Sequence, residues 1–293
     1  MPNTKEILRR IHTVHSLSQV TGAMEMVSAS RMRRSQERVL AARPYAEKTR
    51  ELMRRLARAS VGEAIHPLLT VRPVRHYALI LIASDRGLCG AYNHNVVHEA
   101  ARYVAGRSEP ATYIAVGRRA REAIMRWGGD LMAEFEGIPA DLTIAYASPI
   151  ARLVEDAFLG GDIDAAVVAY TRFVSAGTQR AEVRQLLPIV PPAAADDDAS
   201  PPEPRHVEYI YEPSPAAILE RLLPHSLEVE ILGFLLESVA SEHSARMIAM
   251  RSATDNANEM VDDLTRTYNR MRQSAITSEL LDITGTTEAL RSA

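Results

Sequence analysis

The stretch that decides the fold runs from Leu227 to Leu281 and reads LEVEILGFLLESVASEHSARMIAMRSATDNANEMVDDLTRTYNRMRQSAITSELL. It holds no proline, and Gly233 is its one glycine. Apolar or small residues recur along it at steps of three and four, which is the spacing of one helix face. At a rise of ~1.5 Å per residue this helix would be about 80 Å long, several times the average globular length of ~11 residues. Such a helix needs a partner along its whole length. The predicted stripe comprises Leu227, Ile231, Leu235, Val239, Ile248, Ser252, Asn256, Met260, Leu264, Thr267 and Met271.

A second long helix is predicted from residue 3 to about residue 58. Asn3 or Thr4 can cap it, and Glu6 falls in its first turn, where a carboxylate is favoured. Pro44 lies inside the pattern and is expected to bend or break the helix, because proline lacks the backbone N–H. The predicted apolar stripe comprises Ile7, Ile11, Val14, Leu17, Val20, Met24 and Val27.

The two long helices carry opposite net charge. Residues 1–60 hold thirteen Lys or Arg and five Asp or Glu, a net charge of +8. Residues 228–293 hold six Arg and eleven acidic residues, a net charge of −5. Complementary flanks favour an antiparallel coiled coil of the two ends of the chain.

The middle of this coiled coil is expected to be poor in large apolar groups. Its predicted seam includes Ser28, Ala245, Ser252 and Asn256, and each buried methylene contributes only ~0.8 kcal/mol. Two interpretations stay open at this point. The coil is either exposed and frayed, or it is a shaft enclosed by a larger assembly, with a surface poor in large apolar groups so that it does not lock in one orientation.

The segment between the long helices has a different character. Tyr77–Ala83 (YALILIA) is a continuous apolar run that ends in a polar turn, which indicates a buried parallel strand. Strands and helices then alternate, as in an open, Rossmann-like α/β sheet. The predicted fold is therefore mixed, with a terminal coiled-coil helix at 1–60, an α/β domain at 74–212 and a second coiled-coil helix at 213–285. Further predicted strands are 112–116, 165–174, 182–189 and an edge strand at 206–211; predicted helices are 91–105, 118–127 and 150–159, and 191–204 is a proline-rich, acidic stretch expected to be a mobile loop.

Composition limits the class of protein. The 293 residues carry a net charge of −3, so no overall bias toward nucleic acid exists. One cysteine, Cys89, excludes a disulfide framework and fits a reducing compartment. Charged residues interrupt the start of the chain, so no signal peptide is expected, and no apolar run reaches the ~18 residues of a membrane span. The chain is expected on the cytoplasmic side, at most docked peripherally.

The sequence contains only weak matches to the motifs of catalytic and ligand-binding sites. The turn Asp85–Gly90 follows a strand, where phosphate sites occur, but it lacks the G-x-G-x-x-G spacing and a Walker lysine. Cys89 has no marked His and Asn or Asp partners, which favours a buried structural thiol over a nucleophile. We expect no H-x-x-x-H or H-E-x-x-H ligand pattern among the nine histidines, and hence no zinc site. The sequence thus predicts no catalytic, cofactor or metal residues. The basic cluster Arg31–Arg34 lacks interleaved aromatic residues, so an acidic protein surface is a better partner for it than nucleic acid.

Four segments together resemble the gamma subunit of F-type ATP synthases. They occur in the family's order and span the chain from the first helix to Glu279: Ala23–Met32 (AMEMVSASRM), Ser84–Gly90 (SDRGLCG), Ser241–Met247 (SEHSARM), and Ala253–Ala257 (ATDNA) through Tyr268–Gln273 (YNRMRQ). The family fold is an antiparallel coiled coil with an α/β domain at its base, as predicted from the residues.

The resemblance implies a non-catalytic rotor shaft that couples rotation of the c ring to ATP synthesis or hydrolysis on beta subunits of a proton-translocating enzyme. The implied partners are three alpha and three beta subunits, epsilon and the c ring, at the cytoplasmic face of the bacterial inner membrane. No cofactor is implied. A free-standing coiled-coil scaffold or adaptor is the alternative. The residues that match stator contacts are Met24, Arg31, Arg33, Arg34, Arg272, Gln273 and Thr277, and those that match the foot facing the c ring are Tyr209, Tyr211 and Glu212.

Overall fold

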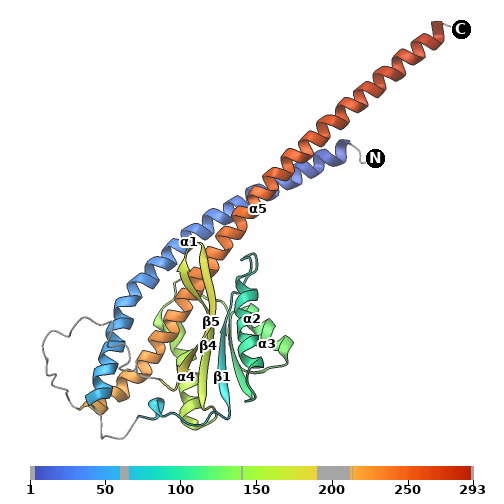
Figure 1. Ribbon diagram of the computed structural model, residues 1–293. Coiled ribbons are helices and arrows are strands. Elements are labelled where there is room, and N and C mark those ends of the chain that lie inside the picture. Colours follow the sequence, from blue (N-terminus) through green and yellow to red (C-terminus); the bar gives the residue numbers. More distant parts are fainter. Residues whose placement is uncertain (1–3, 60–65, 140, 190–211, 213, 292–293) are drawn as a thin grey trace. The chain divides into compact units, whose positions relative to one another are not determined.

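The computed structural model describes residues 4–59, 66–139, 141–189, 212 and 214–291 (Figure 1). The chain divides into two compact units: Met1–Ser28 with Arg246–Ala293 form unit 1, and Ala29–Ala245 form unit 2. The two long helices, α1 (Thr4–Ala59) and α5 (Pro215–Arg291), contribute residues to both. The domain boundaries expected near residues 60, 74 and 213 stay a prediction. The expected strand at 206–211 and the expected loop at 191–204 lie outside the described residues.

Both long helices continue through a proline. The predicted break at Pro44 is wrong, because α1 continues through that residue. Helix α5 begins at Pro215 and includes Pro224. An interior proline costs ~3 kcal/mol in a helix. Burial of Leu223 and Leu227, on either side of Pro224, offsets that cost, because each buried leucine contributes about 1.5–3 kcal/mol.

Unit 2 is built on a five-stranded sheet with the order β3-β2-β1-β4-β5. The first four strands in that order are parallel, and β5 pairs antiparallel with β4. All six residues of β1 are buried, because the strand lies at the centre of a sheet that is covered on both faces. This confirms the continuous apolar run as a central strand. The strands are β1 (Tyr77–Ile82), β2 (Ala111–Val116), β3 (Asp130–Phe135), β4 (Ala165–Ser175) and β5 (Thr178–Leu187).

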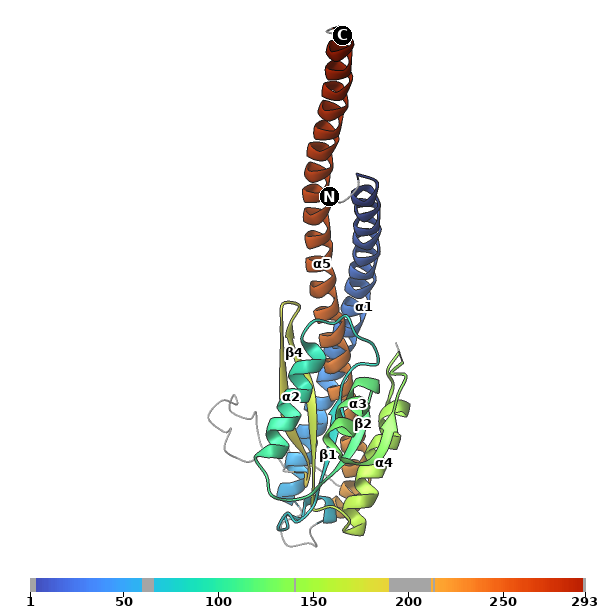
Figure 2. The same ribbon diagram turned by 90° about the vertical axis from the view of Figure 1, so that its right-hand side faces the viewer.

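Helices cover the two faces of this sheet (Figures 1 and 2). On one face, α2 (Tyr92–Ala105) and α3 (Arg118–Trp127) pack against Leu79, Leu81 and their neighbours. On the other face, α4 (Ile144–Gly160) and the unit 2 part of α5 pack against Ile80 and Ile82. The short 3-10 helix Pro67–Leu69 adds the fully buried Leu68 to this second core.

Serines at steps of three fix α5 to the β4–β5 hairpin. Ser241 Oγ donates to the Thr171 carbonyl at 3.1 Å, and Ser244 Oγ donates to the Ala176 carbonyl. Gln179 Nε2 in turn donates to Ser244 Oγ at 3.1 Å. These hydroxyls are buried, and their bonds satisfy them without a large apolar contact.

Several bounds within unit 2 differ from the predictions. The helices expected at 91–105 and 118–127 agree with α2 and α3. β3 was missed, because this edge strand is only partly buried and its alternation is weak. Helix α4 begins at Ile144, six residues before the prediction, and includes Pro149. β4 ends at Ser175 and β5 begins at Thr178, four residues before the prediction, so the two residues between them form the hairpin turn.

Candidate functional site

Unit 1 is an antiparallel pair of helices whose seam has polar contacts in its middle. Thr254 Oγ1 donates to Thr21 Oγ1 at 2.7 Å, and Ser18 Oγ donates to Asn258 Oδ1 at 2.6 Å. An ion pair joins Arg251 to Glu25 at 2.8 Å. Partial or full burial recurs at alternating steps of three and four, the repeat of a coiled coil. The seam positions are Thr4, Ile7, Ile11, Val14, Ser18, Thr21, Glu25 and Ser28 on α1, and Met250, Thr254, Ala257, Val261, Leu264, Tyr268 and Met271 on α5.

This seam corrects the predicted stripes. On α1 the prediction left the seam after Val14, and on α5 only Leu264 and Met271 of the predicted unit 1 stripe lie in it. On α1 after Val14 the predicted stripe followed large apolar side chains, whereas the seam holds Ser18, Thr21 and Ser28. Of the small residues expected in the seam, Ser28 lies in it, whereas Ser252 and Asn256 are exposed. On α5 the seam instead holds larger side chains such as Val261, Leu264 and Tyr268. The predicted stripe residues that are exposed are Leu17, Val20 and Val27 on α1, and Ile248, Ser252, Asn256, Met260 and Thr267 on α5.

The outward side of unit 1 carries large apolar groups, so the expectation of a surface poor in them was wrong. On α1, Leu17 is 54% exposed, Val20 56% and Met26 70%. A freely solvated coil would keep such side chains in the seam and polar residues outside. Exposed large apolar side chains in this unit are Leu8, Leu17, Val20, Met26 and Val27 on α1, and Ile248, Met260, Ile276, Leu280, Leu281 and Ile283 on α5.

The end of α5 has no partner helix within the described residues. Because Thr21 lies opposite Thr254, the start of α1 at Thr4 falls opposite Met271. From 272 to 287 every residue of α5 is exposed. Most of the stability of a protein helix comes from packing of one face against other residues, and the described part of the chain offers this segment no such packing.

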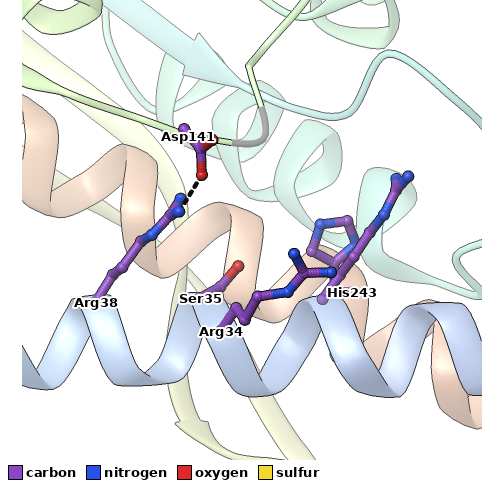
Figure 3. A pocket seen from close by; sticks show the side chains of 6 residues that line it. Arg34, Ser35, Arg38, Asp141 and His243 are labelled. Atoms are coloured by element: carbon purple, nitrogen blue, oxygen red, sulfur yellow. Dashed lines mark hydrogen bonds and ion pairs between the residues drawn. The ribbon is translucent and has the colours of Figure 1, made fainter.

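A basic pocket of about 160 Å³ lies within unit 2 (Figure 3). Arg31, Arg34 and Arg38 line it along one side of α1, and Arg38 pairs with the carboxylate of Asp141. His243 of α5 faces the same space in Figure 3. Neither Arg31 nor Arg34 forms an ion pair with a residue in the described ranges. Three guanidinium groups against one carboxylate leave the pocket positively charged.

The turn Asp85–Gly90 has a structural role. The Asp85 carboxylate accepts the backbone N–H of Ile138 at 2.9 Å and that of Arg118 at 3.1 Å. Asn93 Nδ2 lies 3.1 Å from the sulfur of Cys89, which is 2% exposed. These contacts join the ends of β1, β2 and β3. They agree with the interpretation of Cys89 as a buried thiol.

The described residues hold no group of three or more side chains that could bind a metal ion. None of their helices combines the length and the apolar character that crossing a membrane requires.

Comparison with known proteins places the chain. The profile of a family described as ATP synthase matches residues 3–290. A protein of Dehalococcoides mccartyi strain CBDB1 named ATP synthase gamma chain is 42% identical over 291 residues, which cover 99% of this chain and 100% of the relative. The chain belongs to the ATP synthase gamma-chain family.

A further relative and two solved structures are also similar to this chain. A Roseiflexus sp. strain RS-1 protein of the same name is 43% identical over 294 residues, 99% of each chain. A chain of the Euglena gracilis mitochondrial ATP synthase (OSCP/F1/c-ring, rotational state 3) superposes with a TM-score of 0.68 at 19% identity, covering 99% of this chain and 95% of its own. A chain of the Tetrahymena thermophila central stalk and c ring gives 0.61 at 24% identity, covering 80% and 99%. These two structures share the fold.

The stator-contact residues expected from the gamma-chain resemblance fall in four places. Met24 is half-buried in unit 1, and Arg31 and Arg34 line the basic pocket. Arg33 instead pairs with Glu37 at 3.4 Å along the exposed side of α1. Arg272, Gln273 and Thr277 lie on the unpartnered end of α5, where the Thr277 hydroxyl donates to the Gln273 carbonyl at 2.9 Å.

Of the expected foot residues, Glu212 is exposed, and Tyr209 and Tyr211 lie outside the described residues. The pocket adds three residues that the sequence reasoning missed: Arg38, Asp141 and His243. Arg38 could have been found, because it stands seven residues after Arg31 on the same helix face. The sequence also contains one H-x-x-x-H pair, His94 and His98, that the search for metal ligands overlooked.

Proposed function

We propose that this chain is the non-catalytic central-stalk rotor subunit of a proton-translocating F-type ATP synthase. It couples rotation of the c ring to conformational changes, and hence to ATP synthesis or hydrolysis, on the beta subunits. Its partners are three alpha and three beta subunits, epsilon and the c ring. It is held peripherally at the cytoplasmic face of a bacterial inner membrane through that complex. Membership of the gamma-chain family supports this proposal.

The observation that carries the proposal is the polarity of α1 between Leu17 and Ser28. Ser18, Thr21 and Ser28 lie in the seam, while Leu17 and Val20 are more than half exposed on the outside. Each apolar side chain left in water forgoes part of the about 1.5–3 kcal/mol that full burial contributes. A surrounding collar of alpha and beta subunits would recover that energy.

The end of α5 supports the same role. Ile276, Leu280 and Ile283 are 48%, 57% and 62% exposed on a helix segment without a partner in the described part of the chain. Arg272 and Gln273 begin this segment and are exposed. In the proposed complex the segment is enclosed by the stator, and these two polar residues hydrogen-bond to it.

The basic pocket supplies a second contact. Acidic loops of the beta subunits would place carboxylates against Arg31 and Arg34, whose charge no described residue neutralises by an ion pair. Hydrogen bonds to charged groups contribute about 1.5–3 kcal/mol when they are shielded from water. Met24 and Arg33 are proposed to extend this contact along α1. Coupling then follows from asymmetry, because an off-centre shaft contacts three chemically identical beta subunits differently and shifts their conformational equilibria.

The foot residues Tyr209, Tyr211 and Glu212 are proposed to face the c ring. This assignment depends on their match to the family alone. The terminal helices at 1–60 and 213–285 are proposed to form the shaft, and the α/β domain at 74–212 is proposed to form the foot.

Co-purification and coupled pumping test the proposal. Expressed with alpha, beta and epsilon subunits, the chain is expected to elute with all of them, whereas a free-standing scaffold would elute alone. In inverted membrane vesicles, Arg272→Ala with Gln273→Ala is expected to lower ATP-driven proton pumping per ATP hydrolysed. The matched control is Arg126→Ala, which removes an exposed arginine from α3. Unchanged pumping per ATP in the double variant would overturn the assignment of Arg272 and Gln273.

A further inference from the structure

Two histidines one helical turn apart on α2 are exposed to solvent. The ring centroids of His94 and His98 are 6.0 Å apart, and the ring planes are inclined by 29°. Neither imidazole forms a hydrogen bond or an ion pair with any residue that the structure describes. The packing of the helix therefore does not explain this pair.

The helix that carries the pair is firmly held. Tyr92 is 4% exposed, and Val96 and Ala100 are fully buried against the sheet. These residues occupy the inner face of α2, so the spacing between the two exposed histidines is set by the fold. Two ligands on a rigid support bind an ion more tightly than two free ligands, because the second bond forms at high effective concentration.

We propose that His94 and His98 form an open, two-imidazole site for a borderline divalent transition-metal ion: Cu²⁺, Ni²⁺ or Zn²⁺. Imidazole nitrogen is a preferred ligand of these ions, and histidines at positions i and i+4 of a helix present their rings on one face. An ion about 2.0–2.1 Å from one nitrogen of each ring places the two ring centroids roughly 5–6 Å apart. The observed 6.0 Å fits this requirement after rotation about the exposed side-chain torsions.

The site is open because this chain supplies only two ligands. No third candidate joins them among the described residues. The neighbouring Glu99 carboxylate pairs with Arg102 at 2.6 Å. Water fills the remaining positions of the bound ion, so a further donor from solution or from a neighbouring molecule can enter. Affinity follows the order of these metals for nitrogen ligands, with Cu²⁺ bound more tightly than Ni²⁺ or Zn²⁺.

Metal titration of the untagged full chain tests the site. Calorimetry with Cu²⁺, Ni²⁺ and Zn²⁺ salts is expected to show one ion per chain. The variant His98→Gln is expected to raise the dissociation constant by on the order of 10²-fold, because the second linked ligand is lost. Circular dichroism confirms that the variant folds. The spectrum of bound Cu²⁺ adds an independent readout, since electron paramagnetic resonance distinguishes two nitrogen donors from one.

A second pair of histidines is the matched control. His12 and His15 are also exposed, on α1, but stand three residues apart. The double variant His12→Gln/His15→Gln is expected to bind metal as the wild type does. The proposal is overturned if His94→Gln and His98→Gln leave the affinity and the Cu²⁺ spectrum unchanged, or if only the control variant loses binding. The result is independent of the rotor role, which these side chains do not enter.

Discussion

Replacing Leu17 and Val20 by glutamine separates the stability of the chain from its assembly. Both side chains are more than half exposed, at 54% and 56%, and lie outside the seam. Glutamine is a good helix former, and surface substitutions usually change stability by no more than ~0.5 kcal/mol. The isolated chain is therefore expected to unfold at nearly the same urea concentration as the wild type.

Assembly should respond differently. About half of each side chain remains to be buried by a collar, so each would contribute about 0.8–1.5 kcal/mol, half of the about 1.5–3 kcal/mol of full burial. The two together amount to about 1.5–3 kcal/mol. Since ~1.4 kcal/mol is a tenfold change in an equilibrium constant, the double variant is expected to bind alpha and beta subunits about 10- to 140-fold more weakly.

A seam variant provides the opposite control. Thr21 is 6% exposed, and its hydroxyl accepts a hydrogen bond from Thr254. Thr21→Ala is expected to destabilise the isolated chain by about 1 kcal/mol, with no direct effect on an outer contact. Urea unfolding followed by circular dichroism measures the first quantity. Competition with labelled wild-type chain for immobilised alpha and beta subunits measures the second. Equal loss of stability in the two variants would refute the assignment of Leu17 and Val20 to an outer contact surface. Undiminished assembly of the Leu17→Gln/Val20→Gln variant would refute it as well.

Three further predictions concern charge and ionisation. Arg31→Gln with Arg34→Gln removes the unneutralised charge of the pocket and is expected to weaken the salt-dependent part of binding to beta subunits, so that its affinity changes less between low and high salt than that of the wild type. Asp164→Asn should reduce the acid sensitivity of folding. The backbone N–H of Arg75, and then that of His76, donates to this carboxyl and lowers its pKa. The stabilisation is therefore present above the ordinary pKa and is lost as pH falls through the folded pKa, and the free energies of unfolding at pH 7 and pH 3 measure the difference. Tyr146→Phe should reduce the alkaline sensitivity of folding. Burial raises the pKa of this phenol to about 12, so the unfolded state loses its proton first and the wild type loses stability between pH 10 and pH 12. A variant whose stability falls with pH as steeply as that of the wild type over this range would contradict the prediction.

The α/β unit was largely predictable because its strands and helices carry strong local signals. The run YALILI has no polar residue, and only a strand covered on both faces has that composition. Helix α3 ends at a glycine in the left-handed conformation, Gly128, with φ of 69°. The strand after it was missed because Asp130 and Glu134 are exposed along a half-covered edge. The one signal in the sequence is the glycine at position 129, just before the strand. A Cβ there would lie 2.7 Å from the Tyr113 ring, so glycine permits this close approach to β2.

The basic pocket could be predicted only in part. Arg31, Arg34 and Arg38 share one helix face, which the spacing alone indicates. Asp141 stands 103 residues from Arg38 and comes from the segment before α4. Its contact depends on the tertiary packing of unit 2, which no local pattern contains.

The register of the coiled coil failed for a reason that bears on function. Periodicity analysis assumes that the largest apolar residues face the partner helix. On α1 this assumption selects Leu17, Val20 and Val27, which face outward, over Ser18 and Thr21, which lie in the seam. On α5 the error is different, because the predicted seam residues Ser252 and Asn256 are exposed and Val261 lies in the seam instead. Contact within the helix pair does not explain the large apolar side chains on the outer side of α1, and a surrounding partner would bury them.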